Sequence, residues 1–184
     1  KTIGVVGMGR IGKEVAKRAK AFGMKVLGFD VYWDDSFALE HQVERVDDIH
    51  DLFPRVDYLS LHTNLTPETR ELIRGETINL LKPDAVILNC ARGEIVNTND
   101  VAVALQSGVL RGYGTDVLDE EPPAVEHPLT KLPNCLVTPH IGSRTRESVQ
   151  RQAVAAVKNL VHAMRGEPPL AQVNPEVAVQ NVVG

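Results

Sequence analysis

Three polar residues of this 184-residue chain follow predicted strands at the points where those strands end. Arg92 comes after the predicted strand 85–89, Glu121 after the strand 112–116, and His140 after the strand 135–138. In open parallel sheets, ligands bind beyond the carboxyl ends of the strands. The three side chains could therefore reach one cleft.

Their chemical types suit one reaction, the interconversion of an alcohol and a ketone. That reaction needs a base for the hydroxyl proton and a cofactor for the hydride. Histidine titrates near neutral pH, so a residue of this type at position 140 can serve both directions. A carboxylate such as Glu121 beside it would favour the protonated imidazole. The Arg92 guanidinium can clamp a substrate carboxylate and polarise the carbonyl oxygen.

Each of the three residues also has an ordinary structural interpretation. Arg92, next to Gly93, could cap a turn. Glu121 could be a solvated loop acid, and His140 a buried histidine bonded to the backbone. Spacing along the sequence does not show that they meet.

A glycine-rich loop follows the first predicted strand. Residues 7–12 read Gly-Met-Gly-Arg-Ile-Gly and fit the pattern G-x-G-x-x-G between a predicted strand and a predicted helix. Gly7 permits a tight turn, Gly9 lets a pyrophosphate approach the backbone, and Gly12 allows close packing of helix on strand. Arg10 and Ile11 supply backbone amides at the positive end of the helix dipole.

Asp30 ends the second predicted strand, 18 residues after Gly12. An acid in this position hydrogen-bonds the adenosine ribose hydroxyls of a dinucleotide. The same carboxylate would repel a 2′-phosphate, and no Arg or Lys lies between Asp30 and Arg45. The sequence therefore predicts NAD as the cofactor rather than NADP.

The elements that must position these residues alternate between strand and helix. We predict strands at 2–6, 25–29, 58–61, 85–89, 112–116 and 135–138, and helices at 11–22, 47–53 with Asp47 as N-cap, 68–81 interrupted at Gly75, 98–107 and 144–165. Such alternation predicts an α/β fold, a Rossmann-type doubly wound parallel sheet in three α/β/α layers.

Composition excludes several other classes of protein. Hydrophobic residues make up 43% of the chain and aromatic residues 4%, which suits parallel strands buried under helices. The formal net charge of -4 argues against a nucleic-acid partner, and the apolar runs are too short to span a membrane. Two cysteines are too few for a disulfide framework, so a reducing, cytoplasmic setting is expected. We predict no metal site.

Three further motifs carry a resemblance to a known family. They are Asn89-Cys90-Ala91-Arg92-Gly93, the run from Asp116 through Glu121 to Pro122, and Thr138-Pro139-His140-Ile141-Gly142-Ser143. Together with the glycine loop and Asp30 they resemble the D-isomer-specific 2-hydroxyacid dehydrogenases, in the right order and over nearly the whole chain. Asn64 is a departure, because the family often has proline there. Glu121 disfavours formate, since formate dehydrogenases of this fold usually have glutamine in its place.

The resemblance implies a role for each matching residue. Arg92 would bind the carboxylate and carbonyl of a small 2-hydroxy or 2-oxo acid, with His140 as general acid/base and Glu121 as its partner. Thr63, Cys90, Ala91, Asp116 and Gly142 would join Arg92 and His140 in lining the cofactor site. The resemblance also implies a homodimer. Phosphoglycerate-type, glycerate/hydroxypyruvate-type and lactate-type substrates stay open, and the phosphoglycerate dehydrogenases resemble the chain most.

The resemblance further implies a division of the chain. Residues 1–170 would form the NAD-binding domain, and residues 171–184 a linker towards a substrate domain that is mostly absent here. A second hypothesis belongs to another class, an NAD-sensing corepressor that shares this fold and keeps the catalytic residues. Turnover of 2-oxo acids separates the two hypotheses.

Overall fold

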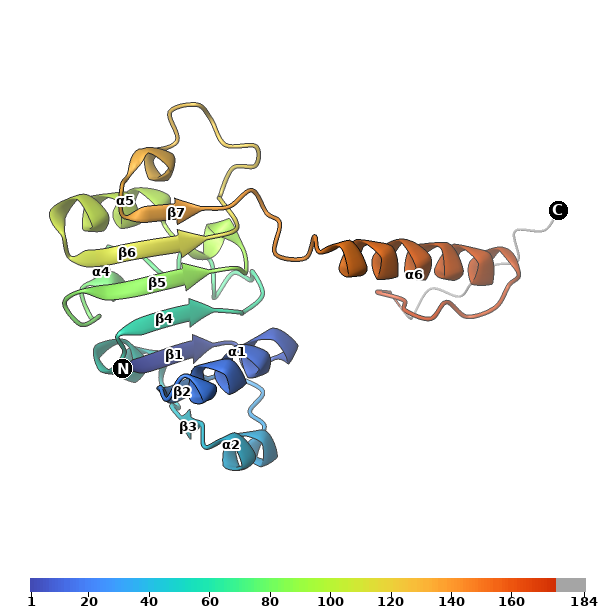
Figure 1. The fold of residues 1–184 in the computed structure, drawn as a ribbon, viewed down its shortest axis with the longest axis horizontal. Helices are drawn as coiled ribbons and strands as arrows, with labels where there is room; N and C mark the ends of the chain where they lie inside the picture. Colours follow the sequence, from blue (N-terminus) through green and yellow to red (C-terminus); the bar gives the residue numbers. More distant parts are fainter. Residues whose placement is uncertain (175–184) are drawn as a thin grey trace. The chain divides into compact units, whose positions relative to one another are not determined.

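The computed structural model describes residues 1–174 and contains one parallel sheet. Its seven strands lie in the order β3-β2-β1-β4-β5-β6-β7, and every neighbouring pair is parallel (Figure 1). The strands are β1 (Thr2–Val6), β2 (Lys25–Phe29), β3 (Glu44–Arg45), β4 (Tyr58–Leu61), β5 (Ala85–Asn89), β6 (Leu110–Thr115) and β7 (Cys135–Val137). This order is the doubly wound arrangement of Rossmann folds with one strand added, as predicted.

Helices cover both faces of the sheet. In the unit that contains the sheet, the helices are α1 (Arg10–Ala21), α2 (Asp35–His41), α3 (Ile49–Leu52), α4 (Gly75–Ile78) and α5 (Thr98–Ser107), with the 3₁₀ helices η1 (Phe53–Arg55), η2 (Gly93–Ile95) and η3 (Pro128–Lys131). Helix α6 (Arg146–Met164) belongs to a second unit. Alternate strand residues separate into two cores, as the period of a strand requires. Val5 of β1 packs in the core that includes α1 and α2, whereas Val6 packs in the core that includes α3 and α5.

The strand order reverses direction between β1 and β4, which are neighbours in the sheet but not in the chain. The loops that follow these two strands therefore leave the same edge of the sheet side by side. A crevice at such a switch point is where ligands bind in open α/β sheets. The glycine loop follows β1, and His62 and Thr63 follow β4.

The chain forms two compact units, Lys1–His140 and a second unit that begins at Ile141. Helix α6 belongs to the second unit and confirms the predicted helix 144–165 with slightly shorter bounds. Thr145 caps it, because its side chain accepts a hydrogen bond from the Ser148 N–H. Residues 171–174 form neither helix nor strand, and the rest of the predicted linker lies outside the described residues. The domain boundary at residue 170 stays a prediction.

The helix predicted over 68–81 is wrong for most of its length. Residues 71–73 pair with residues 94–97, since Glu71 N–H donates to Glu94 O and Ile73 N–H donates to Ile95 O, at 2.9 and 3.0 Å, and Ile73 forms a β-bridge with Val96. Only the short helix α4 forms, and it begins at Gly75. The backbone hydrogen bonds of residues 71–73 go to a distant segment, which periodicity within the segment cannot reveal.

Two smaller predictions also need correction. The helix predicted at 47–53 divides into α3 and η1, and its N-cap is Asp48 rather than Asp47, because the Asp48 carboxylate accepts the His50 N–H. Helix α2 and strand β3 were not predicted. Asp34 caps α2 by accepting the Phe37 N–H, while β3 has only two residues and gives no periodic signal.

No helix within residues 1–174 has both the length and the apolar character to cross a membrane.

Candidate functional site

The glycine loop packs so tightly that side chains are excluded at two of its glycines. A Cβ on Gly7, whose φ is +92°, would lie 2.6 Å from the carbonyl carbon of His62. A Cβ on Gly12 would lie 1.9 Å from the Gly7 oxygen. A Cβ on Gly9, in contrast, would meet nothing within 4 Å. The loop is thus closed against the protein at Gly7 and Gly12 and open at Gly9, where a pyrophosphate would approach.

The N-terminus of α1 suits an anion. Gly9 is its N-cap and offers no capping side chain, and no acidic residue stands in the first turn. The first-turn amides, those of Arg10 and Ile11 included, have no intrahelical acceptor, and the helix dipole adds positive potential there. The residues present therefore fit the phosphates of a dinucleotide.

Asp30 is half-buried at the end of β2, directly beside the glycine loop. Its Oδ2 atom accepts the Met8 N–H at 2.5 Å, and its Oδ1 atom accepts the Tyr32 N–H at 2.7 Å. A carboxylate has about four lone-pair sites, so capacity remains for ribose hydroxyls. The two residues that follow, Val31 and Tyr32, have exposed hydrophobic side chains.

The loop after β4 borders the crevice at the switch point on the side opposite the glycine loop. Thr63 is half-buried there, and its hydroxyl lies 3.5 Å from the Asn64 oxygen. His62 Nε2 lies 2.8 Å from Ser60 Oγ, while its Nδ1 atom is buried without a hydrogen-bond partner among the described residues. Burial lowers the pKa of this imidazole, which favours the neutral ring, and the backbone of His62 lies against Gly7 of the glycine loop.

The three residues proposed for chemistry lie in one pocket of about 210 Å³. Arg92, Glu121 and His140 line it together with Gly93, Glu94, Val117, Leu118 and Asp119. His140 Nδ1 lies 2.7 Å from Glu121 Oε2, which is a direct hydrogen bond. The structure thus brings together three side chains from the loops after β5, β6 and β7.

Each Glu121 oxygen has a defined partner. Oε2 pairs with His140, and Oε1 accepts the Leu118 N–H at 3.0 Å. The hydrogen bond from His140 and then that from Leu118 lower the pKa of Glu121, so this carboxylate stays charged at neutral pH. Nδ1 of the half-exposed His140 is thus engaged with Glu121, and a catalytic role for Nε2 stays a prediction.

The backbone of His140 adopts an unusual conformation. Its φ is +51°, in the left-handed region that side chains other than glycine rarely adopt. The His140 N–H donates to the Thr138 oxygen at 3.0 Å and thereby holds this turn. Such strained positions cluster at functional sites, where the surrounding structure fixes them.

Asn89 fixes the turn that carries Arg92, and sequence reasoning did not assign it this role. Its side chain is fully buried, accepts the Ala91 N–H at 3.0 Å and donates to the Arg92 oxygen at 2.9 Å. A Cβ on Gly93 would lie 2.0 Å from the Leu118 carbonyl carbon, so the Arg92 turn presses on the loop of Glu121. The sequence offered one sign of this role: Asn89 is a polar residue at the end of an apolar strand.

The remaining predicted cofactor residues occupy different environments. Cys90 is exposed, and desolvation followed by the charge of Asp116 raises the pKa of its thiol. Asp116 is buried, and its Oδ1 atom accepts the Thr138 hydroxyl at 2.6 Å. Ala91 is buried in the sheet core. Gly142 lies in the second unit, and its part in the site stays a prediction.

The sheet order, the glycine loop and Asp30 together define a dinucleotide-binding domain of the Rossmann type. Residues 1–142 match the family model described as "D-isomer specific 2-hydroxyacid dehydrogenase, NAD binding domain". The chain belongs to this family, which confirms the resemblance, the fold and the NAD cofactor predicted from sequence.

Curated relatives agree with this assignment. The chain is 44% identical over 167 residues to D-3-phosphoglycerate dehydrogenase of Methanocaldococcus jannaschii, covering 91% of this chain and 32% of the relative. It is 41% identical over 179 residues to glyoxylate reductase of Thermofilum pendens, covering 96% and 52%. The chain therefore spans from a third to about half of the length of these relatives.

Solved structures share the fold. The TT0316 protein from Thermus thermophilus matches with a TM-score of 0.87 and 43% identity, over 94% of this chain and 53% of that one. D-lactate dehydrogenase with NAD+ from Lactobacillus jensenii matches with a TM-score of 0.85 and 31% identity, over 94% and 55%.

Proposed function

We propose that the protein containing this chain transfers a hydride between NAD and the CH–OH group of a small D-2-hydroxy acid, reducing the 2-oxo acid in reverse. The observation that carries this proposal is the 2.7 Å pair between His140 and Glu121 in one pocket with Arg92. The names of the relatives refer to glyoxylate, hydroxypyruvate, lactate or phosphoglycerate. All of these are 2-oxo or 2-hydroxy acids.

The chain's own residues account for holding the cofactor. The amides of Arg10 and Ile11 would hold the pyrophosphate, and Asp30 would accept hydrogen bonds from the adenosine ribose hydroxyls. Thr63, Asp116 and the backbone of residues 90–92 would hold the nicotinamide end. When bound, NAD supplies the hydride acceptor or donor for the substrate's C2 carbon.

Arg92 and His140 divide the substrate's polar groups between them. The Arg92 guanidinium holds the carboxylate in a fork and lies near the C2 oxygen. In oxidation, neutral His140 takes the hydroxyl proton on Nε2; in reduction, the imidazolium returns it to the carbonyl oxygen. Glu121 stabilises the imidazolium through Nδ1 and keeps the ring oriented. As a further proposal, the working protein is a homodimer, as the family resemblance implies.

We expect the protein to bind NAD more tightly than NADP. The Asp30 carboxylate, already within 2.5 Å of the Met8 amide, repels a 2′-phosphate at the ribose it binds. Asp30→Ala should weaken NAD binding by about tenfold, the value of one good hydrogen-bonding contact, and narrow the preference over NADP. Asp35→Ala, at an exposed acid in the first turn of α2, is the matched control. Equal calorimetric affinities of the unchanged protein for both cofactors would contradict this account.

Glu121→Gln tests the proposed acid/base pair through pH. Reduction needs protonated His140, and the Glu121 carboxylate, whose pKa is lowered by this same hydrogen bond, supplies the opposing charge. Glutamine removes that charge and with it the electrostatic support for the imidazolium that reduction uses. The pH at which 2-oxo acid reduction falls to half its maximum should therefore move down.

The control for this experiment is Glu120→Gln, which changes an exposed neighbouring acid in the same loop. It should leave the pH profile of reduction in place. Superimposable profiles for Glu121→Gln and the unchanged protein would mean that the pair does not act in the reaction.

A further inference from the structure

The loop between β6 and β7 carries Glu121 and is unusually long. It runs from residue 116 to residue 134 and is exposed over residues 119–126. A long exposed loop samples many conformations, yet Glu121 must stay 2.7 Å from His140. Something in the loop has to limit its motion.

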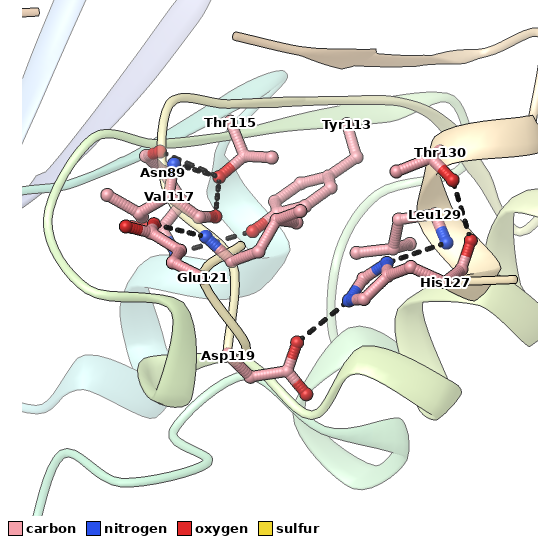
Figure 2. Close-up of polar contacts among 10 residues, drawn as sticks. Asn89, Tyr113, Thr115, Val117, Asp119, Glu121, His127, Leu129 and Thr130 are labelled. Atoms are coloured by element: carbon pink, nitrogen blue, oxygen red, sulfur yellow. Dashed lines mark hydrogen bonds and ion pairs between the residues drawn. The ribbon is translucent and has the colours of Figure 1, made fainter. Parts of the chain in front are cut away.

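We propose that Asp119 and His127 are positioning residues, and that the hydrogen bond between their side chains closes this loop and holds Glu121 against His140. His127 Nε2 lies 3.0 Å from Asp119 Oδ1 (Figure 2). This inference rests on the proposed function, because it assigns to the pair an effect on the acid/base chemistry of His140.

His127 has a side chain that is buried and is held by hydrogen bonds. Its side chain is only 4% exposed, although the loop around it is open to solvent. Its Nδ1 atom accepts the Leu129 N–H at 3.4 Å, and its carbonyl oxygen accepts the Thr130 hydroxyl at 2.9 Å, as Figure 2 shows. Because Nδ1 is an acceptor, the ring proton sits on Nε2 and is donated to Asp119.

Asp119 is held from a second side as well. Burial raises the pKa of its carboxyl, but hydrogen bonds from His127 and from Thr98 at the start of α5 outweigh burial and lower the pKa. The charged Asp119 carboxylate therefore links Thr98 of α5 to His127, the residue before η3. It also lines the pocket of Arg92 and His140, so its position bears directly on the site.

Glu121 lies between two fixed points of this loop. On one side Leu118 is wedged against Gly93 and donates its N–H to Glu121 Oε1 at 3.0 Å. On the other side, the Asp119–His127 hydrogen bond ties the start of the loop to the buried His127 side chain. Opening that bond lengthens the free segment and raises the entropy cost of holding Glu121 at His140.

The test is Asp119→Ala in the whole protein, measured as the pH profile of NADH-dependent 2-oxo acid reduction. We expect kcat to fall by about tenfold, a usual scale for losing the support of a catalytic group, with KM for NADH nearly unchanged. The pH profile of reduction should move to lower pH, as is expected for Glu121→Gln. Asp119→Asn keeps an acceptor for His127 Nε2–H and should restore most of the activity and the profile. Val125→Ala, at an exposed apolar residue of the same loop, is the matched control.

A double variant separates this role from simple destabilisation. In the Glu121→Gln background, Asp119→Ala should add little further loss of kcat and no further pH shift, because its effect passes through Glu121. If Asp119→Ala fails to fold, Asp119→Ser, whose hydroxyl is too short to reach His127, gives the same readout.

Two results would overturn the positioning role. One is an Asp119→Ala profile that coincides with that of the unchanged protein, whatever its kcat. The other is an effect of equal size in the Glu121→Gln background. If Glu121→Gln itself leaves the pH profile of reduction unchanged, the proposed acid/base function fails. That outcome differs from a failure of the Asp119–His127 role, in which Glu121→Gln shifts the profile and Asp119→Ala does not.

Discussion

Replacing His140 by alanine is expected to lower kcat by about a hundredfold or more, the usual scale for a positioned acid/base. In the proposed mechanism, the pocket then has no group at the place of Nε2 to exchange the substrate's proton, while Arg92 would still bind the carboxylate. The glycine loop and Asp30 follow β1 and β2, several strands away from β7 in the sheet, so NAD affinity should change little. Steady-state turnover and a calorimetric NAD titration measure the two effects separately.

The matched control for this prediction is His50→Ala, which removes an exposed imidazole from α3. It should leave kcat within about twofold, the scatter of surface changes. Full turnover by His140→Ala would mean that His140 has a structural role and that another group moves the proton.

Gly9→Ala should separate cofactor binding from folding. Gly9 has a φ of -71°, which alanine adopts freely, and its Cβ would meet nothing within 4 Å of the protein. The melting temperature should therefore stay near that of the unchanged protein. The new methyl group occupies the space through which a pyrophosphate approaches the first-turn amides, so we expect NAD affinity to fall by about tenfold or more, at least about 1.4 kcal/mol.

Gly75→Ala is the control for Gly9→Ala, because its Cβ makes only ordinary contact with Asp100, at 3.5 Å, and lies outside the glycine loop. It should change neither the melting temperature nor NAD affinity appreciably. Unchanged NAD affinity in Gly9→Ala would show that the pyrophosphate does not cross this loop.

The features predictable from sequence were those whose cause is local. The glycine loop, Asp30 and the central strands depend on residues near one another in the chain, and the structure has them where predicted. Residues 71–73 were assigned wrongly because their hydrogen bonds go to residues 94–97. The pattern within the segment carries no trace of that pairing.

The meeting of Glu121 and His140 is a nonlocal fact of the same kind. Their contact depends on a long loop after β6 and on the left-handed turn after β7, neither of which has a periodic signal. Asn89 and the buried His127 went unassigned for another reason. Their backbone partners are only two or three residues away, but the sequence does not show that these polar side chains are buried.

The most direct test of the account is to incubate the whole protein with NADH and a panel of glyoxylate, hydroxypyruvate, pyruvate and phosphohydroxypyruvate, and to follow NADH absorbance and product chirality. We predict that at least one 2-oxo acid is reduced, with one D-2-hydroxy acid formed for each NADH consumed where the product is chiral, and that His140→Ala abolishes most of this turnover. Tight NADH binding without reduction of any of these acids would contradict the account and favour an NAD-sensing binding protein of the same fold.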